Sequence, residues 1–141
     1  MSEAEAAAVD NVASKLGFKN GDLIQEFGYD EDVDFELRAD IEDLIDSEIL
    51  TEEDQEVVDA VLLWWRDEDG DLVDALMDSL TTLGEGGEVW VLTPKAGRDG
   101  YVQPADLQEA APTAGLHVTT QAAGVSGDWT ATRLVSTRNK G

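Results

Sequence analysis

The sequence of 141 residues contains no cysteine and only one histidine, His117. Without cysteine the chain can form no disulfide, no thiolate zinc site and no cysteine nucleophile. With one histidine, a Ser-His-Asp triad could use only His117, and a metal site of several histidines cannot be built. His117 stands at the start of an expected strand, and we interpret it as a structural or surface residue. These absences remove several classes of enzyme and metal protein.

The sequence also lacks a long apolar run and is poor in basic residues. No segment approaches the roughly 20 apolar residues that span a bilayer, and the first ten residues are acidic and alanine-rich, so we expect a cytoplasmic protein. Nine Lys and Arg against 32 Asp and Glu give a formal net charge of −23. Nucleic acids and anionic membranes carry the same sign, which argues against both as direct partners. The expected partner is a basic protein surface.

The acidic residues are concentrated in one half of the chain. Residues 1–80 hold 26 acids and 4 bases, whereas residues 81–141 hold 6 acids and 5 bases. Adaptation of a whole proteome to salt would acidify both halves alike, so the asymmetry favours a charged face with a binding role; a solvated face that serves solubility is the alternative. The candidate partner-binding residues are Asp30, Glu31, Asp32, Asp34, Glu36, Asp40, Glu42, Asp43 and Asp46.

Apolar periodicity and turn residues predict alternating strands and helices after a flexible acidic tail at residues 1–12. The expected strands are 22–27, 57–65 and 89–93, with a brief edge strand at 49–50. The expected helices are 32–45, 72–83 and 104–114, and the glycines of 84–87 are expected to terminate the second one. Residues 116–125 and 129–135 predict an antiparallel hairpin. Residues 137–141 are expected to form a basic tail.

This order of elements predicts a single α/β domain over residues 13–136. The almost continuous apolar run at 57–65 is typical of a parallel strand that is covered on both faces. Trp64 and Trp65 point to opposite faces of that strand, so each face needs a helix layer, and core packing is the expected role of most of the four tryptophans. We expect a three-layer Rossmann-like, mostly parallel sheet with one reversed strand, from the antiparallel C-terminal hairpin, at its edge.

A sheet that ends in a helix and a reversed hairpin strand resembles the back half of the S-adenosylmethionine-dependent methyltransferase fold. Six phrases follow one another in an order known from a protein family: Lys15-Leu-Gly-Phe18, Asp59-Ala-Val-Leu-Leu-Trp-Trp-Arg66, Asp69-Gly-Asp-Leu-Val-Asp-Ala-Leu76, Leu92-Thr-Pro-Lys95, Ala110-Ala-Pro-Thr-Ala-Gly-Leu116 and Asp128-Trp-Thr-Ala-Thr-Arg-Leu-Val135. They resemble the actinobacterial domain-of-unknown-function family 3052 (DUF3052), over about Ala13 to Val135. The resemblance implies a truncated methyltransferase-like fold. It implies no catalytic residue, because that family has no established activity.

The turn after the first strand lacks the glycine-rich loop that would hold a cofactor. Residues 26–32, Glu-Phe-Gly-Tyr-Asp-Glu-Asp, offer one glycine, then a tyrosine and three acids. Such a turn prevents close approach of the backbone to a ligand, and its charge would repel a phosphate. We therefore expect no cofactor.

The acid clusters do not match a calcium loop. Asp30, Asp32 and Asp34 have the one-three-five spacing of an EF-hand, but Phe35 stands where glycine is required. In the cluster of Asp67, Asp69 and Asp71, the glycine stands at position four. We expect no specific metal site; for this second cluster, weak divalent-ion binding is an alternative to helix capping by Asp69 or Asp71.

The loop at 94–101 follows a buried strand, at the expected carboxyl edge where such sheets bind ligands. Its two cations, Lys95 and Arg98, either contact an anionic ligand or neutralise the neighbouring acidic face. Together with Gly28, Tyr29 and Asp59 they form a candidate ligand edge.

Two functions from different classes follow. The leading hypothesis is a non-enzymatic regulatory or adaptor domain that binds a basic protein surface through its acidic N-terminal half, with mimicry of nucleic acid toward a DNA- or RNA-binding protein as a special case. The alternative is a small-molecule binder or a diverged methyltransferase-like enzyme that uses the carboxyl edge of the sheet.

Overall fold

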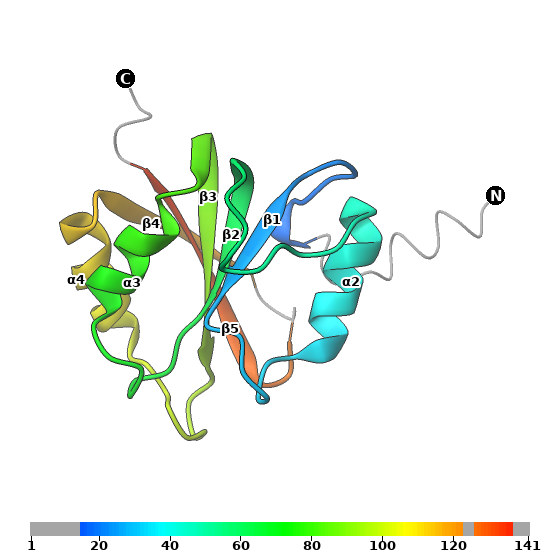
Figure 1. Cartoon of the computed structure of the whole chain (residues 1–141). Helices are drawn as coiled ribbons and strands as arrows, with labels where there is room; N and C mark the ends of the chain where they lie inside the picture. The colour runs from blue at the N-terminus through cyan, green and yellow to red at the C-terminus, as the bar shows by residue number, and fades with distance from the viewer. Residues whose placement is uncertain (1–14, 123–125, 137–141) are drawn as a thin grey trace.

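The computed structural model describes residues 15–122 and 126–136, which form a five-stranded sheet with helices on both faces (Figure 1). In chain order the elements are β1 (Ile24–Phe27), α2 (Phe35–Ile45), β2 (Val58–Trp64), α3 (Leu72–Ser79), β3 (Leu83–Pro94), α4 (Pro104–Thr113), β4 (Leu116–Ala122) and β5 (Trp129–Ser136). Helix α2 covers one face of the sheet, and α3 and α4 cover the other. The predicted three-layer α/β class is confirmed. The expected tails at 1–12 and 137–141 lie outside the described residues.

The strand order is β1-β2-β3-β5-β4, in which β1, β2 and β3 are parallel and β5 runs antiparallel to both of its neighbours. One reversed strand was predicted, but its expected place at the edge was wrong: β5 lies inside the sheet and β4 forms the edge. Burial explains the order, because β5 buries Trp129, Ala131 and Leu134, whereas β4 exposes Thr119 and Thr120. The strand expected at 49–50 is reduced to one parallel bridge, between Gln25 and Leu50.

The core has two layers, one on each face of the sheet. Alternation along β2 sends Leu62 and Trp64 to the α2 side, and Val61, Leu63 and Trp65 to the side of α3 and α4. The predicted split of Trp64 and Trp65 between the two faces is confirmed. Trp90 and Trp129 are also buried, so all four tryptophans belong to the core.

Aspartates begin the two helices that follow acidic loops. The side chain of Asp34 accepts a hydrogen bond from the N–H of Leu37 at the start of α2, and Asp71 accepts from the N–H of Val73 at the start of α3. Such caps satisfy N–H groups that have no partner inside the helix. The predicted capping by Asp71 is confirmed.

Helix α3 ends earlier than the glycines predicted. It stops at Ser79, and Leu83 already pairs with Val58 of β2. Gly84 and Gly87 lie inside β3 instead of terminating α3, so that prediction was wrong. A Cβ atom on Gly87 would lie 2.8 Å from the carbonyl oxygen of Asp59. Glycine is needed here because a side chain would meet the backbone of β2 where the pairing of the two strands shifts register, a contact that local sequence does not reveal.

Candidate functional site

The candidate site is the carboxyl edge of the sheet between β1 and β2. After β1 the chain passes through α2 to the bridge at Leu50, on one side of β1, and then crosses to β2 on the other side. The direction of strand order therefore reverses between β1 and β2. In open α/β sheets this switch point is where ligands bind.

Gly28 brings the turn after β1 against the end of β2. Its φ is 79°, and a Cβ atom on it would lie 2.3 Å from the carbonyl oxygen of Trp64. Its N–H donates to Oε2 of Glu52, at 3.0 Å, in the segment after the bridge at Leu50. The backbone of this turn thus contacts other parts of the protein where a ligand-binding sheet would leave it open.

Arg66, directly after β2, fills the switch point with a buried guanidinium group. Nη2 and Nε donate to Oδ1 and Oδ2 of Asp32, at 2.5 and 3.0 Å. Nη1 donates to the carbonyl oxygens of Gly28 and Trp64, at 2.9 and 3.2 Å, and to Oδ2 of Asp69, at 3.2 Å. One side chain therefore ties together the loops that follow β1 and β2.

The contacts around Arg66 favour the charged forms of both Arg66 and Asp32. The hydrogen bonds from Arg66 hold the pKa of Asp32 below its ordinary value, against the opposing effect of burial. The guanidinium carbon of Arg66 lies 5.2 Å from the ring centre of Trp129, a distance at which a cation is attracted to the ring face. Trp129 in turn packs edge to face against Trp64, with ring centres 5.0 Å apart.

A second ion pair closes the α2 side of the same edge. Glu26, 5% exposed, accepts from Nε and Nη2 of Arg38, at 2.7 and 2.9 Å, and from Nε1 of Trp64, at 2.8 Å. These bonds to Glu26 chiefly raise the pKa of Arg38 above its ordinary value. The guanidinium of Arg38 lies over the ring of Tyr29, 4.9 Å from its centre. Both arginines of this edge are thus satisfied by the protein itself.

Two hollows border Tyr29 and Glu52, one of about 320 Å³ and one of about 460 Å³. The carboxylates that line the smaller one are Asp30, Glu52, Asp69 and Asp78. Those that line the larger one are Glu26, Glu52 and Glu53. With one guanidinium in each, the balance of charge suits a cationic group better than a phosphate.

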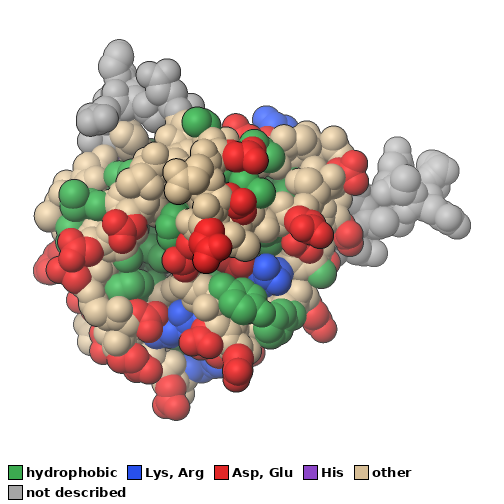
Figure 2. Space-filling view, viewed as in Figure 1, with side chains coloured by type: hydrophobic (Ala, Val, Ile, Leu, Met, Phe, Trp, Pro, Cys, Tyr) green, Lys and Arg blue, Asp and Glu red, His purple; other side chains and the backbone are tan. Residues whose placement is uncertain are grey.

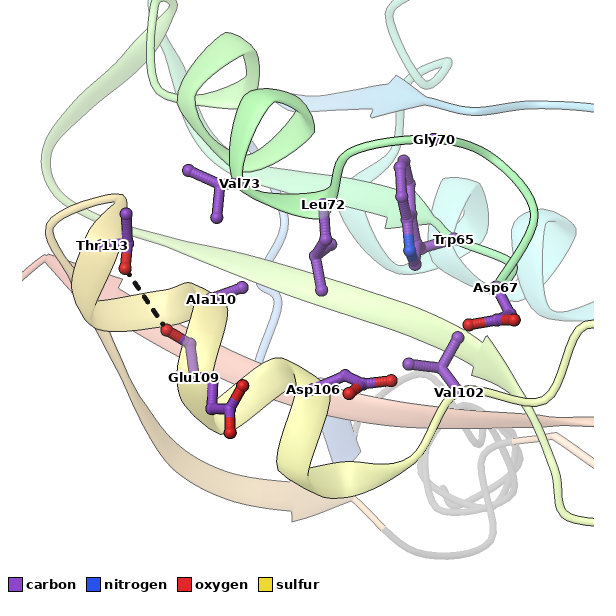
Figure 3. Close-up of a pocket in the computed structure, with 10 residues that line it drawn as sticks. All are labelled: Trp65, Asp67, Gly70, Leu72, Val73, Val102, Asp106, Glu109, Ala110 and Thr113. Atoms are coloured by element: carbon purple, nitrogen blue, oxygen red, sulfur yellow. Dashed lines mark hydrogen bonds between the residues drawn. The ribbon is translucent and has the colours of Figure 1, made fainter.

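A third hollow, of about 390 Å³, lies between α3 and α4 (Figure 3). Trp65, Leu72 and Val102 provide much of its apolar lining. Its carboxylates are Asp67, Asp106 and Glu109. Side chains of both helices and of the loop after β2 face it, so it too is an acidic hollow.

The residues of the candidate ligand edge do not all meet. Gly28 and Tyr29 lie at the switch point, as the sequence indicated. Asp59 is the second residue of β2 and lies at the opposite, amino-terminal edge, where its Oδ2 accepts from the N–H of Leu23 at 2.9 Å; its expected place near the mouth was wrong. The start of a parallel strand faces away from the carboxyl edge.

Lys95 and Arg98 lie after β3, and of the two only Arg98 has an ion pair among the residues described. Nη1 of Arg98 donates to the carbonyl oxygen of Asp128 at 3.1 Å, its Nε lies 3.9 Å from Oδ1 of the same residue, and its guanidinium lies 5.8 Å from the ring centre of Trp129. Lys95 has no ion pair with any residue in 15–122 or 126–136. Of the two roles considered for these cations, Arg98 therefore has a neighbouring acid as partner, and contact with an anionic ligand stays a prediction for Lys95.

The nine acids of the candidate partner surface divide into two groups. Asp32, Asp34 and Glu42 make internal hydrogen bonds, to Arg66, to the N–H of Leu37 and to the N–H of Ile49. Asp30 also accepts a hydrogen bond, from the N–H of its neighbour Glu31. The other five lie on or beside α2: Glu31, Glu36, Asp40, Asp43 and Asp46. Figure 2 shows acidic side chains spread over this view of the molecule, with few basic ones between them.

Sequence reasoning missed the residues that close the switch point: Arg66, Glu26, Glu52 and Asp69. One signal was available for Arg66, which is one of four bases in the first 80 residues and directly follows the most apolar strand. The pairing of Glu26 with Arg38, or of Gly28 with Glu52, depends on how β1 and α2 pack and has no local signature.

The fold is that of the Rossmann-like S-adenosylmethionine-dependent methyltransferases. The chain is similar to the mitomycin 7-O-methyltransferase MmcR, with a TM-score of 0.63 and 13% identity, over 96% of this chain and 58% of that one. It is also similar to the CcbJ methyltransferase of Streptomyces caelestis, with a TM-score of 0.58 and 12% identity, over 90% and 89% of the two chains. Identities this low establish the fold alone.

The particular family is narrower than that fold. The chain belongs to the family described as "Protein of unknown function (DUF3052)", whose model matches residues 13–138. An uncharacterized protein of Mycobacterium tuberculosis is 52% identical over 130 residues, which cover 92% of this chain and 81% of that protein. The family resemblance read from the six phrases is confirmed.

Within the described ranges, no group of three or more His, Asp or Glu side chains is arranged to hold a metal ion. None of the helices described is long and apolar enough to cross a bilayer.

Proposed function

We propose that this protein is a non-enzymatic binding module, a methyltransferase-like fold that regulates or tethers a basic protein by binding it through the acidic surface of α2. The observation that carries the proposal is the closed switch point: Arg66 and the contact of Gly28 with Trp64 occupy the place where such a sheet would bind a cofactor.

The residues at this edge do not fit S-adenosylmethionine, the cofactor that the fold family implies. The turn backbone that should approach the ligand instead contacts the carbonyl oxygen of Trp64. The guanidinium of Arg66 is buried beside it and donates to the carbonyl oxygens of Gly28 and Trp64, so the backbone groups that end both strands are already occupied. These contacts support a binding role over methyl transfer.

The charge pattern of α2 supports a partner that is basic. Glu36, Asp40 and Asp43 follow at spacings of four and three, so they share one face of the helix. Burial raises the pKa of Asp40, and repulsion from Asp43 and Glu36 raises it further. The last turn of α2 contains Glu42 and Asp43 and no basic residue, and negative charge is unfavourable beside the negative end of the helix dipole. A basic surface docked here would relieve this repulsion.

The test is an affinity pull-down from native lysate, at low and at raised salt, with three forms of the protein. The test variant is Glu36→Gln/Asp40→Asn/Asp43→Asn. The control variant, Asp74→Asn/Asp78→Asn/Glu109→Gln, removes the same charge from α3 and α4 on the opposite face. We expect one basic protein to bind the wild type and the control, to be lost from the test variant, and to elute as salt shortens the Debye length, which is about 8 Å at physiological ionic strength. Equal retention by all three forms would contradict the proposal.

A second candidate function is small-molecule binding or a diverged transferase activity at the same edge. The hollow of about 320 Å³ beside Gly28, Tyr29 and Glu52 favours it. Thermal unfolding with S-adenosylmethionine or S-adenosylhomocysteine tests it, because a ligand at 100 times its dissociation constant adds about 2.7 kcal/mol to stability. We expect no shift in melting temperature. A shift that Glu52→Gln abolishes would favour this second function instead.

A further inference from the structure

A fourth cavity, of about 420 Å³, lies on the other side of the carboxyl edge, among the loop after β3, the start of α4, and strands β4 and β5. Its polar lining consists of Thr93, Lys95, Tyr101, Gln121, Thr130 and Thr132. No carboxylate lines it. Each of the three hollows described above is lined by three or more carboxylates. In a chain with 32 acids, this cavity is electrostatically different from its surroundings.

The floor of the cavity is a polar patch on an apolar face of the sheet. Thr93 of β3 pairs with Thr130 of β5, and Thr132 of β5 pairs with Gln121 of β4. Further along the same side of β3 and β5, the residues belong to the core under α3 and α4. Hydroxyl groups in such a place lower stability unless they find hydrogen-bond partners. A structural core would be served better by valine, which has nearly the shape of threonine.

Thr93 is the member of this patch that points to a ligand. The residue is 4% exposed, and its hydroxyl makes no hydrogen bond with any residue of the described ranges. Among the residues described, every fully buried side-chain oxygen or nitrogen has a hydrogen-bond partner. Because the Thr93 hydroxyl has none, it is not fully buried, and it is open to the cavity that Thr93 lines. Because this hydroxyl has no partner in the described part of the chain, its hydrogen bonds are made with whatever occupies the cavity.

Positive charge converges on the same cavity from two sides. Lys95 lines it and, as described above, has no ion pair in that part of the chain. Helix α4, ten residues long, begins at Pro104 on the cavity wall, and its N-cap residue Gln103 makes no side-chain capping bond. The positive end of the helix dipole adds to the charge of Lys95, while Asp106, the acidic residue of the first turn, faces the neighbouring hollow between α3 and α4.

We propose that this cavity binds the phosphate group of a small phosphorylated metabolite. Lys95 supplies charge, Thr93, Thr130 and Thr132 supply hydroxyl donors, and the first turn of α4 supplies the end of its dipole. A phosphate has more acceptor oxygens than the two of a carboxylate, so it can use more of these donors at once. Tyr101, 39% exposed on the cavity wall, offers a ring against which the rest of the metabolite packs. The site is separate from the acidic surface of α2 and does not depend on the function proposed above.

The test is a titration of the full chain with inorganic phosphate at constant ionic strength, followed by backbone amide NMR, with acetate as the comparison anion. We expect saturable shifts centred on Thr93, Lys95 and the first turn of α4, with phosphate bound more tightly than acetate. Lys95→Gln should weaken phosphate binding about tenfold, the usual size for one charge-assisted hydrogen bond. Thr93→Val, which keeps the shape and removes the hydroxyl, should weaken it about threefold.

The matched control is Lys19→Gln, which removes the same charge from the turn before β1 and should leave phosphate binding unchanged. Amide spectra of each variant establish that it is folded. Three results would overturn the proposal: no saturable shifts with phosphate, equal binding of phosphate and acetate, or phosphate binding that Lys95→Gln and Lys19→Gln affect equally.

Discussion

Gly28 combines a left-handed backbone with a close contact, and the two effects are separable. A Cβ atom on Gly28 would meet the carbonyl oxygen of Trp64 at 2.3 Å, whereas Gly17 has a similar φ, 84°, and nothing within 4 Å. We expect Gly17→Ala to lower the free energy of unfolding by about 1 kcal/mol, the cost of the left-handed region. Gly28→Ala should cost about 3 kcal/mol or more, because the clash is with backbone. Urea denaturation measures both; equal losses would mean that the turn can move away from β2.

The ion pair of Arg66 and Asp32 predicts a pH dependence at the residue scale. Because the pKa of Asp32 is lowered in the folded state, its contribution to stability is full above the ordinary Asp value of about 3.9 and is lost as pH falls through the folded value. Arg66→Gln should lower the free energy of unfolding by about 2 kcal/mol at pH 7. The difference from wild type should shrink below about pH 4, without vanishing, because the bonds to Gly28 and Trp64 do not titrate.

The control for that experiment is Arg98→Gln. Its pair with Asp128 is exposed and long, at 3.9 Å, so the loss should stay within about 0.5 kcal/mol and vary little with pH. A pH-independent difference for Arg66→Gln would show that Asp32 contributes nothing through its charge.

At the scale of an element, repulsion among acidic side chains of α2 lowers the stability of the fold. The pKa of Asp40 is raised, so its charge lowers the stability of the fold above the folded pKa, and this penalty disappears below the unfolded value of about 3.9. Asp40→Asn should therefore raise the free energy of unfolding at pH 7 by about 0.5 kcal/mol, the size of two like-charge pairs along a helix. The gain should fade toward pH 4. Asp74→Asn is the matched control: Asp74 lies in the first turn of α3, where the dipole favours a negative charge, so its loss should slightly destabilise.

Local pattern predicted the elements well where burial is periodic and less well where strands meet. The spacing of Leu37, Ile41 and Ile45 predicted α2 because a buried face alone determines it. The end of α3 was wrong because Gly84 and Gly87 serve the pairing of β3 with β2, a contact between distant segments. The residues of the site divide in the same way, into those that local sequence locates and those that depend on contacts between distant segments. Gly28 was located from the turn itself, whereas the roles of Arg66 and Lys95 depend on which carboxylates lie near them in space.

For the whole molecule, a net charge of −23 predicts that salt stabilises the fold. Folding brings 32 acids closer together than in the unfolded chain, and screening weakens that repulsion. We expect the urea midpoint at pH 7 to rise as sodium chloride is added from low ionic strength toward about 0.15 M, where the Debye length is about 8 Å. The rise should be smaller in Glu36→Gln/Asp40→Asn/Asp43→Asn. A midpoint that is independent of salt would mean that the acidic residues are too far apart in the fold to repel one another.

The position of β5 has a consequence for biosynthesis. Because β5 (Trp129–Ser136) lies between β3 and β4 but follows both in the chain, a ribosome that has released everything up to Ala122 has produced a sheet with an open edge on β3 and an unpaired β4. Unpaired strand edges are where nascent chains associate with one another. Insertion of β5 completes two ladders at once, so the nascent protein reaches its native sheet in one late step, and chaperone protection is most useful in the interval before it.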